Sequence, residues 1–264
     1  MYKYIFLSMT AVMLVSLAAE AKESMTGREV VVRYDRQIRA STEEVEMTMN
    51  LINKDGKART RQLVSISKTN EEGKQDSLLR FVEPADVRGT ALLTHEHADA
   101  DDDRWLYLPA LRKTRRVAAT DDSDNFMGSD FAYEDIDFEE LNAFDYKLLG
   151  DEIKDGFDCY IVEATPSTEK KAKESGYSRR IMWIRKDNYF MVAVDYYNSR
   201  NELTKQRKAY EIKLVDGTEK WRPERQVMIN LKTGHKTELK YSNFVIGANV
   251  SDRTFSLREL TRGI

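Results

Sequence analysis

Residues 104–136 read RWLYLPALRKTRRVAATDDSDNFMGSDFAYEDI. This stretch begins with an apolar, aromatic run, Trp105 to Leu108, which favours a short β-strand. We expect the strand to end at Pro109 or to lie at an edge of the sheet, because proline has no N–H to donate to a neighbouring strand. Residues 99–140 contain thirteen acids and five bases, a local charge of −8. Loops of this length are usually functional or disordered, so we look for function here first.

The apolar residues of this loop predict either a lid or a cap. Phe126, Met127 and Phe131 lie close to Gly128 in the otherwise charged segment 121–136. This combination is typical of a movable lid over an apolar site. It is equally typical of an ordered loop that closes one end of a sheet permanently, and both interpretations stay open.

A basic cluster precedes the loop, at Arg112, Lys113, Arg115 and Arg116. It could contact an acidic partner or lipid phosphates, as a headgroup site would. The alternative is that it balances the acids at positions 101–103 and 121–124. Charges of both signs are mixed along the whole chain, whose net charge is −3, and this argues against a nucleic-acid partner.

The sequence on both sides of this stretch predicts one helix and a long series of strands. Thr26 and Glu29 have capping-box spacing, and the apolar residues behind them recur at helical spacing, which predicts an amphipathic helix over about 27–39. From position 45 the period changes to two, and turns such as Asp55-Gly56 separate the apolar runs. We expect about ten or eleven consecutive antiparallel strands, a polar loop or short helix over 165–176, and a last strand from Thr254 to Leu260.

An antiparallel sheet of this length must curl or split to protect its edges, and one or two helices are too few to fill its concave side. We therefore expect an apolar cavity on one face of the sheet. The residues predicted to line it are Met47, Met49, Leu79, Phe81, Trp105, Tyr107, Met182, Ile184, Phe190, Val192, Val194 and Tyr210. The alternative is an ordinary close-packed core, which every β protein needs.

Residues 1–21 have the pattern of a secretory signal peptide, with Lys3, an apolar core from Ile5 to Ala18, and an Ala19-Glu20-Ala21 cleavage site. The apolar core is short for an uncleaved membrane anchor, which is the alternative. No cysteine follows the cleavage site, so we do not expect a lipoprotein. The expected mature protein is a single soluble periplasmic domain over residues 22–264, which has no sequence typical of a linker or repeat.

The chain offers one candidate site for catalysis or metal binding. His95 and His97 would point to the same side of a strand and, with a nearby aspartate, could hold a metal. The third histidine, His235, is 138 residues away, and short acidic turns are usually solvated surface. The lone Cys159 alternates with apolar residues, which favours a buried position. We therefore expect no metal, no cofactor and no enzymatic activity.

Three segments of the chain resemble a known family. RWLYLPALRKTRRV at 104–117, MGSDFAYEDI at 127–136 and SGYSRRIMWIRKDNYF at 175–190 are similar to the periplasmic outer membrane lipoprotein-sorting proteins. That family is related to the LolA/LolB lipoprotein carriers and to the sensor RseB, and the likeness covers nearly all of the expected mature chain. The resemblance implies a mainly β fold with a few helices: a half-open, strongly curved antiparallel sheet with a helical or loop lid over an apolar pocket.

The function expected from these features is that of a periplasmic carrier. It would bind lipoprotein acyl chains or another lipid for transfer towards the outer membrane. The resemblance suggests an inner-membrane transporter of the efflux type and an outer-membrane acceptor as partners, and we expect a monomer. Two alternatives remain: an RseB-like lipid sensor that regulates a membrane protein, and a metal-dependent enzyme that uses His95 and His97.

Overall fold

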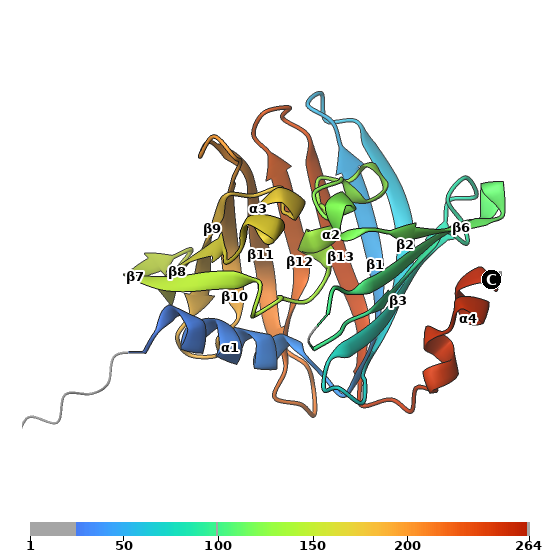
Figure 1. The fold of residues 1–264 in the computed structure, drawn as a ribbon, viewed down its shortest axis with the longest axis horizontal. Coiled ribbons are helices and arrows are strands. Elements are labelled where there is room, and N and C mark those ends of the chain that lie inside the picture. Colours follow the sequence, from blue (N-terminus) through green and yellow to red (C-terminus); the bar gives the residue numbers. More distant parts are fainter. Residues whose placement is uncertain (1–24, 99, 263–264) are drawn as a thin grey trace, which may run out of the picture.

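The computed structural model describes residues 25–98 and 100–262. The described residues form one antiparallel sheet of thirteen strands, more than the ten or eleven that we counted in the sequence. The strands are β1 (Thr42–Ile52), β2 (Ala58–Thr69), β3 (Gln75–Glu83), β4 (Ala91–His95), β5 (Asp103–Leu108), β6 (Lys113–Val117), β7 (Phe144–Lys154), β8 (Phe157–Pro166), β9 (Arg179–Arg185), β10 (Met191–Tyr197), β11 (Leu203–Leu214), β12 (Trp221–Asn230) and β13 (Lys236–Ile246). The predicted fold class, a curved half-open antiparallel sheet, is confirmed (Figure 1).

The order of the strands determines which segment of the chain crosses the concave face of the sheet. It runs β6-β5-β4-β3-β2-β1-β13-β12-β11-β10-β9-β8-β7, so two meanders meet where β1 pairs with β13. The strands β6 and β7 are consecutive in sequence but lie at the two opposite edges (Figure 1). Their connection, residues 118–143, must therefore cross the open side of the sheet. We call it the crossover segment.

The helices lie on both sides of the sheet. The structure contains α1 (Gly27–Ile38), α2 (Tyr133–Ile136), α3 (Glu169–Glu174) and α4 (Leu257–Thr261), with single 3₁₀ turns at Pro109–Leu111, Ala119–Asp121, Phe126–Gly128 and Asp252–Phe255. The helices α1, α2 and α3 lie on the concave side with the crossover segment, and α4 lies outside (Figure 1). No helix in the described ranges is both long enough and apolar enough to cross a membrane. The expected signal peptide, and the alternative of an anchor there, lie outside the described residues.

The helix predicted over about 27–39 is confirmed as α1. The Thr26 hydroxyl accepts from the backbone N–H of Glu29, whose carboxylate accepts from the N–H of Thr26, as a capping box requires. Val30 and Val31 are buried on the helix face that packs against the sheet. Gly27 lies against the backbone of β7, where a Cβ atom would be 2.7 Å from the Leu148 nitrogen.

The strand predicted from Thr254 to Leu260 is wrong. Residues 252–261 form a 3₁₀ turn followed by α4, and Ser251 and Ser256 cap them through hydrogen bonds to backbone N–H groups. Phe255 and Leu260 pack on the outer face of β3 and β4, against Leu78 and Leu93. Phe255 and Leu260 thus form the buried side of two short helical turns, while Leu257 is exposed.

Candidate functional site

The concave face of the sheet carries most of the residues predicted to line a cavity. Met47, Met49, Phe81, Met182, Ile184 and Val194 are buried there in one apolar cluster, and Leu79 packs against it. Phe190 is also buried and lines a pocket on this face. We call this set the inner cluster. Its members confirm the predicted alternation on four strands, β1, β3, β9 and β10, and Phe190 immediately precedes β10.

Trp105 and Tyr107 do not belong to the inner face. Both pack with Leu78, Leu93 and the C-terminal Phe255 in a separate cluster beneath α4. The apolar alternation of β5 is real, but helix α4 covers the outer face of this part of the sheet. Apolar residues are therefore required on both faces, and alternation alone cannot decide which face is inside.

Val192 and Tyr210 are also on the outer face. The pairing of β9 with β10 shifts register between Met191 and Ala193. This bulge directs the Val192 side chain to the outer face, where it packs with Trp183 and Cys159. Tyr210 is paired with Arg225, one residue along from the pair formed by Ala209 and Gln226. Gln226 lines an inner pocket, so the pair of Tyr210 and Arg225 points outwards.

Cys159 is buried in this outer cluster, as the sequence pattern favoured. Burial raises the pKa of its thiol to about 11.

The residues proposed for a lid are packed into the concave side. Phe126 and Phe131 are buried in the inner cluster, and the carbonyl of Met127 accepts a hydrogen bond from Arg61 at 2.6 Å. Asp130 holds this loop to the sheet, because its carboxylate accepts from the Thr237 hydroxyl at 2.8 Å. The loop is ordered and caps the inner cluster in this structure.

Buried ion pairs attach the crossover segment to the sheet. The Arg104 side chain on β5 is 2 % exposed, and its guanidinium lies 2.6 Å from both Asp122 and Asp137 of the crossover segment. It also pairs with Asp102 at 3.1 Å. Burial raises the pKa of Asp102 to about 7, although the nearby Arg104 acts in the opposite direction. Several of the excess acids in residues 99–140 thus form buried ion pairs that attach the crossover segment to the sheet.

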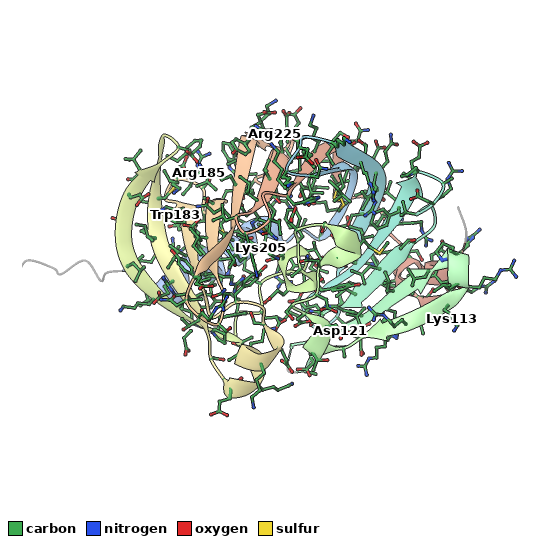
Figure 2. All side chains as sticks on the ribbon, turned by 90° about the horizontal axis from the view of Figure 1, so that it is seen from above. Lys113, Asp121, Trp183, Arg185, Lys205 and Arg225 are labelled. Carbon is green, nitrogen blue, oxygen red and sulfur yellow. The ribbon has the colours of Figure 1, made fainter. Side chains whose placement is uncertain are left out.

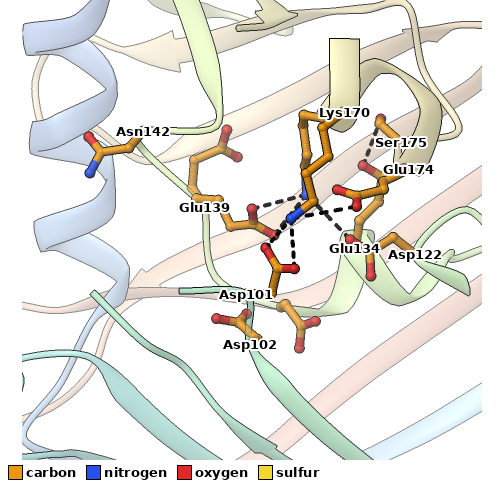
Figure 3. A network of polar contacts seen from close by, with 12 residues as sticks. Asp101, Asp102, Asp122, Glu134, Glu139, Asn142, Lys170, Glu174 and Ser175 are labelled. Carbon is orange, nitrogen blue, oxygen red and sulfur yellow. Dashed lines mark hydrogen bonds and ion pairs between the residues drawn. The ribbon is translucent and has the colours of Figure 1, made fainter. Parts of the chain in front are cut away.

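A second set of ion pairs joins α3 to the crossover segment. Lys171 binds Glu140 at 2.9 Å and Asp122 at 3.3 Å. Lys170 binds Asp101 at 2.7 Å (Figure 3). Glu134 accepts hydrogen bonds at 2.8 Å from the Ser175 hydroxyl and the Gly176 N–H. Burial raises the pKa of Glu134 to about 7. The ion pairs of Lys170 and Lys171 line a polar cleft of about 350 Å³.

The basic cluster lies apart from these ion pairs. Arg112 ends a 3₁₀ turn, and Lys113, Arg115 and Arg116 are exposed along the edge strand β6, with Lys113 at the rim of the molecule (Figure 2). Arg116 pairs with Asp103, while the acids at 102 and 122 pair with Arg104 instead. Charged side chains on an edge strand also discourage pairing with other sheets.

The two histidines of the proposed metal site bind different carboxylates. His95 lies 3.0 Å from Asp76, and His97 lies 3.2 Å from Asp103 and 3.6 Å from Glu72. Burial disfavours the charged imidazole of His97, but the carboxylates of Asp103 and Glu72 outweigh this effect and raise its pKa. In the described part of the chain, no group of three or more His, Cys, Asp or Glu side chains has a metal-binding arrangement.

Two pockets lie on the inner face, on either side of Phe138. The first, which we call the Arg207 pocket, has a volume of about 180 Å³ between α1 and strands β1, β11, β12 and β13. The second has a volume of about 130 Å³ above β2, β3 and β4. Both are lined by Phe138, Glu43 and Ser67, so Phe138 of the crossover segment stands at their boundary. The Arg39 guanidinium lies 4.8 Å from the centre of the Phe138 ring.

The Arg207 pocket is mostly apolar but contains two arginines. Arg222 is paired with Glu43 at 2.5 Å. Arg207 donates to the sulfur of Met191 at 3.5 Å, and within residues 25–98 and 100–262 no carboxylate lies within 4 Å of its guanidinium. The side chains around it include Tyr34 from α1 and Tyr241 from β13. The Arg207 pocket thus joins an arginine that has no carboxylate partner to largely apolar walls.

Comparison with known proteins assigns the chain to a family. A family model described only as an uncharacterized protein matches residues 73–262. An outer membrane lipoprotein-sorting protein domain from Vibrio parahaemolyticus is 32% identical, with a TM-score of 0.82 over 89% of this chain and 98% of that one. A DUF1329 family protein from Desulfovibrio piger is 33% identical, with a TM-score of 0.81 over 89% and 97% of the two chains.

The chain belongs to the family of these outer membrane lipoprotein-sorting and DUF1329 proteins. A LolA superfamily protein from Nitrosomonas europaea shares the fold, with 21% identity and a TM-score of 0.70 over 89% of this chain and all of that one. Among curated proteins, none has a sequence that matches this chain. The family resemblance seen in the sequence is therefore confirmed.

Sequence analysis missed two residues of the inner pockets, Phe138 and Arg207. Phe138 is surrounded by acids in Asp137-Phe138-Glu139, which looks like a solvated loop. Arg207 lies in the basic run Lys205 to Lys208, whose alternation places Arg207 inside and Lys208 outside. The position of Arg207 could have indicated a site, because burying a charged side chain on the inner face of a strand lowers stability unless the charge is paired or binds a ligand.

Proposed function

We propose that this protein is a periplasmic carrier that shields a hydrophobic cargo, lipoprotein acyl chains or another lipid, during transfer towards the outer membrane. The observation that carries the proposal is the concave face of the sheet. It is covered by α1, α3 and the crossover segment instead of a second sheet, and it keeps a pocket with apolar walls. The lipoprotein-sorting name of the Vibrio parahaemolyticus relative supports this proposal.

The physical need for a carrier follows from the cargo. Each methylene group that is removed from water gains roughly 0.8 kcal/mol, so a long acyl chain does not cross an aqueous compartment unaided. The proposed role is binding without a catalytic step. A signal peptide over residues 1–21 would provide the export that such a role requires.

Cargo binding requires the concave side to open further. Ligand pockets usually have volumes of roughly 300–1,000 Å³, whereas the Arg207 pocket has about 180 Å³. The crossover segment is the element that would move, because it separates this pocket from its neighbour through Phe138. We propose that an inner-membrane transporter or an outer-membrane acceptor drives this opening, with the exposed arginines and lysine of β6 as a contact surface.

The test is binding of a naphthylamine dye that fluoresces in apolar sites. Delipidated protein should bind the dye with a saturable curve, and fatty acids or phospholipids should displace it. Ser67 lines both inner pockets, so Ser67→Trp should fill them and weaken dye binding at least tenfold. Ser242→Trp, at an exposed position on β13, is the matched control and should bind like the wild type.

Circular dichroism must show that both variants are folded. If the folded, delipidated wild type binds no apolar probe, the inner face is a filled core and the carrier proposal fails. Equal dye binding by the wild type and Ser67→Trp would place the dye elsewhere on the protein and would also contradict the proposal.

A further inference from the structure

Arg207 differs from the other arginines of the concave side, among which Arg61 also lacks a carboxylate but donates to the Met127 carbonyl at 2.6 Å. Arg104, Arg180 and Arg222 are each held by carboxylates, at 2.6, 2.7 and 2.5 Å. Arg207 reaches only the sulfur of Met191, which is a weak acceptor. A guanidinium withdrawn from bulk water without an anion beside it lowers stability. A position that keeps such a group is therefore suited to an anion that the chain itself does not supply.

The surroundings of Arg207 fit an anion with an apolar tail. Arg207, Arg222 and Glu43 are the charged residues that line the pocket, and they leave a net charge of +1. Arg222 and Glu43 neutralise each other, so the positive charge among the lining residues is at Arg207, on which Asp135 and Glu139 act electrostatically from beyond 4 Å. The remaining wall is largely apolar and aromatic, and includes Ile38, Phe190 and Phe244.

A second donor lies in the same pocket. Tyr34 of α1 lines it, and within the described ranges the Tyr34 hydroxyl has no hydrogen-bond partner. The Tyr241 hydroxyl, by contrast, already donates to Gln226 at 3.0 Å. One guanidinium and one phenol hydroxyl without oxygen partners thus line one small apolar pocket, and both groups donate well to a carboxylate.

We propose that the Arg207 pocket binds the carboxylate of a single-chain amphiphile such as a fatty acid. The head group pairs with Arg207 and accepts from Tyr34, and the chain lies along the apolar wall beside Phe190. This inference rests on the proposed carrier function and narrows its cargo. A single cation matches a single negative charge, and a planar carboxylate matches the two-pronged guanidinium.

The size of the pocket agrees with one chain and not two. A water molecule occupies about 30 Å³ in the liquid, and a methylene group is of similar size, so about 180 Å³ holds roughly six such groups. A longer chain must leave through the mouth or pass Phe138 into the neighbouring pocket. Phe138 therefore sets how much of the chain is enclosed.

The experiment compares three amphiphiles with one tail and different heads. Calorimetric titration of the delipidated full-length protein with dodecanoate, dodecanol and dodecyl phosphate, each below its micelle concentration, should show dodecanoate bound at least tenfold more tightly than dodecanol. In Arg207→Leu the two affinities should become equal, because the affinity for dodecanoate falls. The affinity for dodecanol should stay within threefold of the wild-type value. Arg225→Leu, the same change on the outer face, is the control and should keep the difference (Figure 2).

A readout besides binding separates ligand recognition from a structural role. Because Arg207 has no carboxylate partner, Arg207→Leu should unfold at the same temperature as the wild type or at a higher one. If Arg207→Leu does not fold, Arg207 is a structural residue and the assignment to ligand binding is overturned. Tyr34→Phe tests the site independently, since it removes only a hydroxyl. It should lower the affinity for dodecanoate at least threefold and leave the affinity for dodecanol unchanged.

The outcomes distinguish this inference from the carrier proposal. Equal affinity for dodecanoate and dodecanol in the wild type would overturn the inference and leave the carrier proposal standing. Tighter binding of dodecyl phosphate than of dodecanoate would overturn the carboxylate assignment. Absence of binding by all three amphiphiles and by the apolar dye would contradict both.

Discussion

Two arginines on neighbouring strands show how strongly position determines the role of a residue. Arg207 on β11 faces the inner pocket with no carboxylate within 4 Å, as far as the described chain extends. Arg225 on β12 faces outwards, where its guanidinium lies 3.9 Å from the centre of the Tyr210 ring and near Glu211 and Glu238. The sequence contains both within basic or mixed-charge runs. Only the register of the strands separates them.

Gly27 gives a prediction at the same scale. In helices, alanine is about 1 kcal/mol more favourable than glycine, so propensity alone predicts that Gly27→Ala stabilises α1. The new Cβ atom, however, would lie 2.7 to 2.8 Å from backbone atoms of Tyr146, Lys147 and Leu148 in β7. Backbone cannot yield as a flexible side chain does, and overpacking costs about 1–3 kcal/mol. We therefore expect Gly27→Ala to destabilise the protein in urea denaturation.

The control for this change is Arg36→Ala, at an exposed position of the same helix. It should leave the free energy of unfolding within about 0.5 kcal/mol of the wild type, as is usual for surface positions. If Gly27→Ala is as stable as Arg36→Ala, then α1 and β7 are not in close contact in solution.

At the scale of elements, local signals were predictable and the choice of face was not. The helix at 27–38 and the strands were visible because caps, turns and periodicity are local properties of the sequence. Val192 was assigned to the wrong face because a bulge adds a residue between two correct strands. Trp105 was assigned to the wrong face because helix α4, about 150 residues later, covers the outside.

The crossover segment shows a second limit of sequence analysis. Its many acids suggested an exposed loop, since isolated buried carboxylates are costly. The structure buries several of them against Arg104, Lys171 and Arg180, which come from β5, α3 and β9. Such pairs join residues that are far apart in sequence, and a single sequence does not identify the partners.

Helix α4 provides a prediction at the element scale. The buried Arg80 of β3 donates to the last carbonyls of α4, at 2.7 Å to Glu259 and 2.9 Å to Arg262. A cation at this end also interacts favourably with the helix dipole. Hydrogen bonds to a charged group contribute about 1.5–3 kcal/mol each. Arg80→Met should therefore loosen α4, and hydrogen–deuterium exchange over residues 252–262 should accelerate at least tenfold.

Arg258→Met makes the same change at an exposed position on α4 and should leave this exchange unchanged. Exchange in β1 and β13, far from α4 in the strand order, is an internal reference and should not respond to either variant. Unchanged exchange at 252–262 in Arg80→Met would show that the apolar contacts of Phe255 and Leu260 hold the helix alone.

For the whole molecule, the buried carboxyl groups determine how stability depends on pH. Burial raises the pKa of Asp102 from 3.8 and that of Glu134 from 4.5, each to about 7. Between these ordinary and raised values the folded protein binds more protons than the unfolded chain, so stability falls as the pH rises. The raised pKa of His97 acts in the same direction, because the stabilisation from its carboxylate partners is lost as the imidazole deprotonates. The lowered pKa values of Glu96 and Glu139 matter only in more acidic solution.

We therefore expect the free energy of unfolding to be greater at pH 5.5 than at pH 8, by roughly 2–4 kcal/mol, since one pKa unit corresponds to about 1.4 kcal/mol. Urea denaturation at constant ionic strength measures this difference directly. The double variant Asp102→Asn with Glu134→Gln removes both titrating groups and should flatten most of the dependence, whereas Asp55→Asn in the exposed first hairpin should not. A wild type that is more stable at pH 8 than at pH 5.5 would mean that both carboxylates stay ionised. Burial would then not govern the protonation of Asp102 and Glu134.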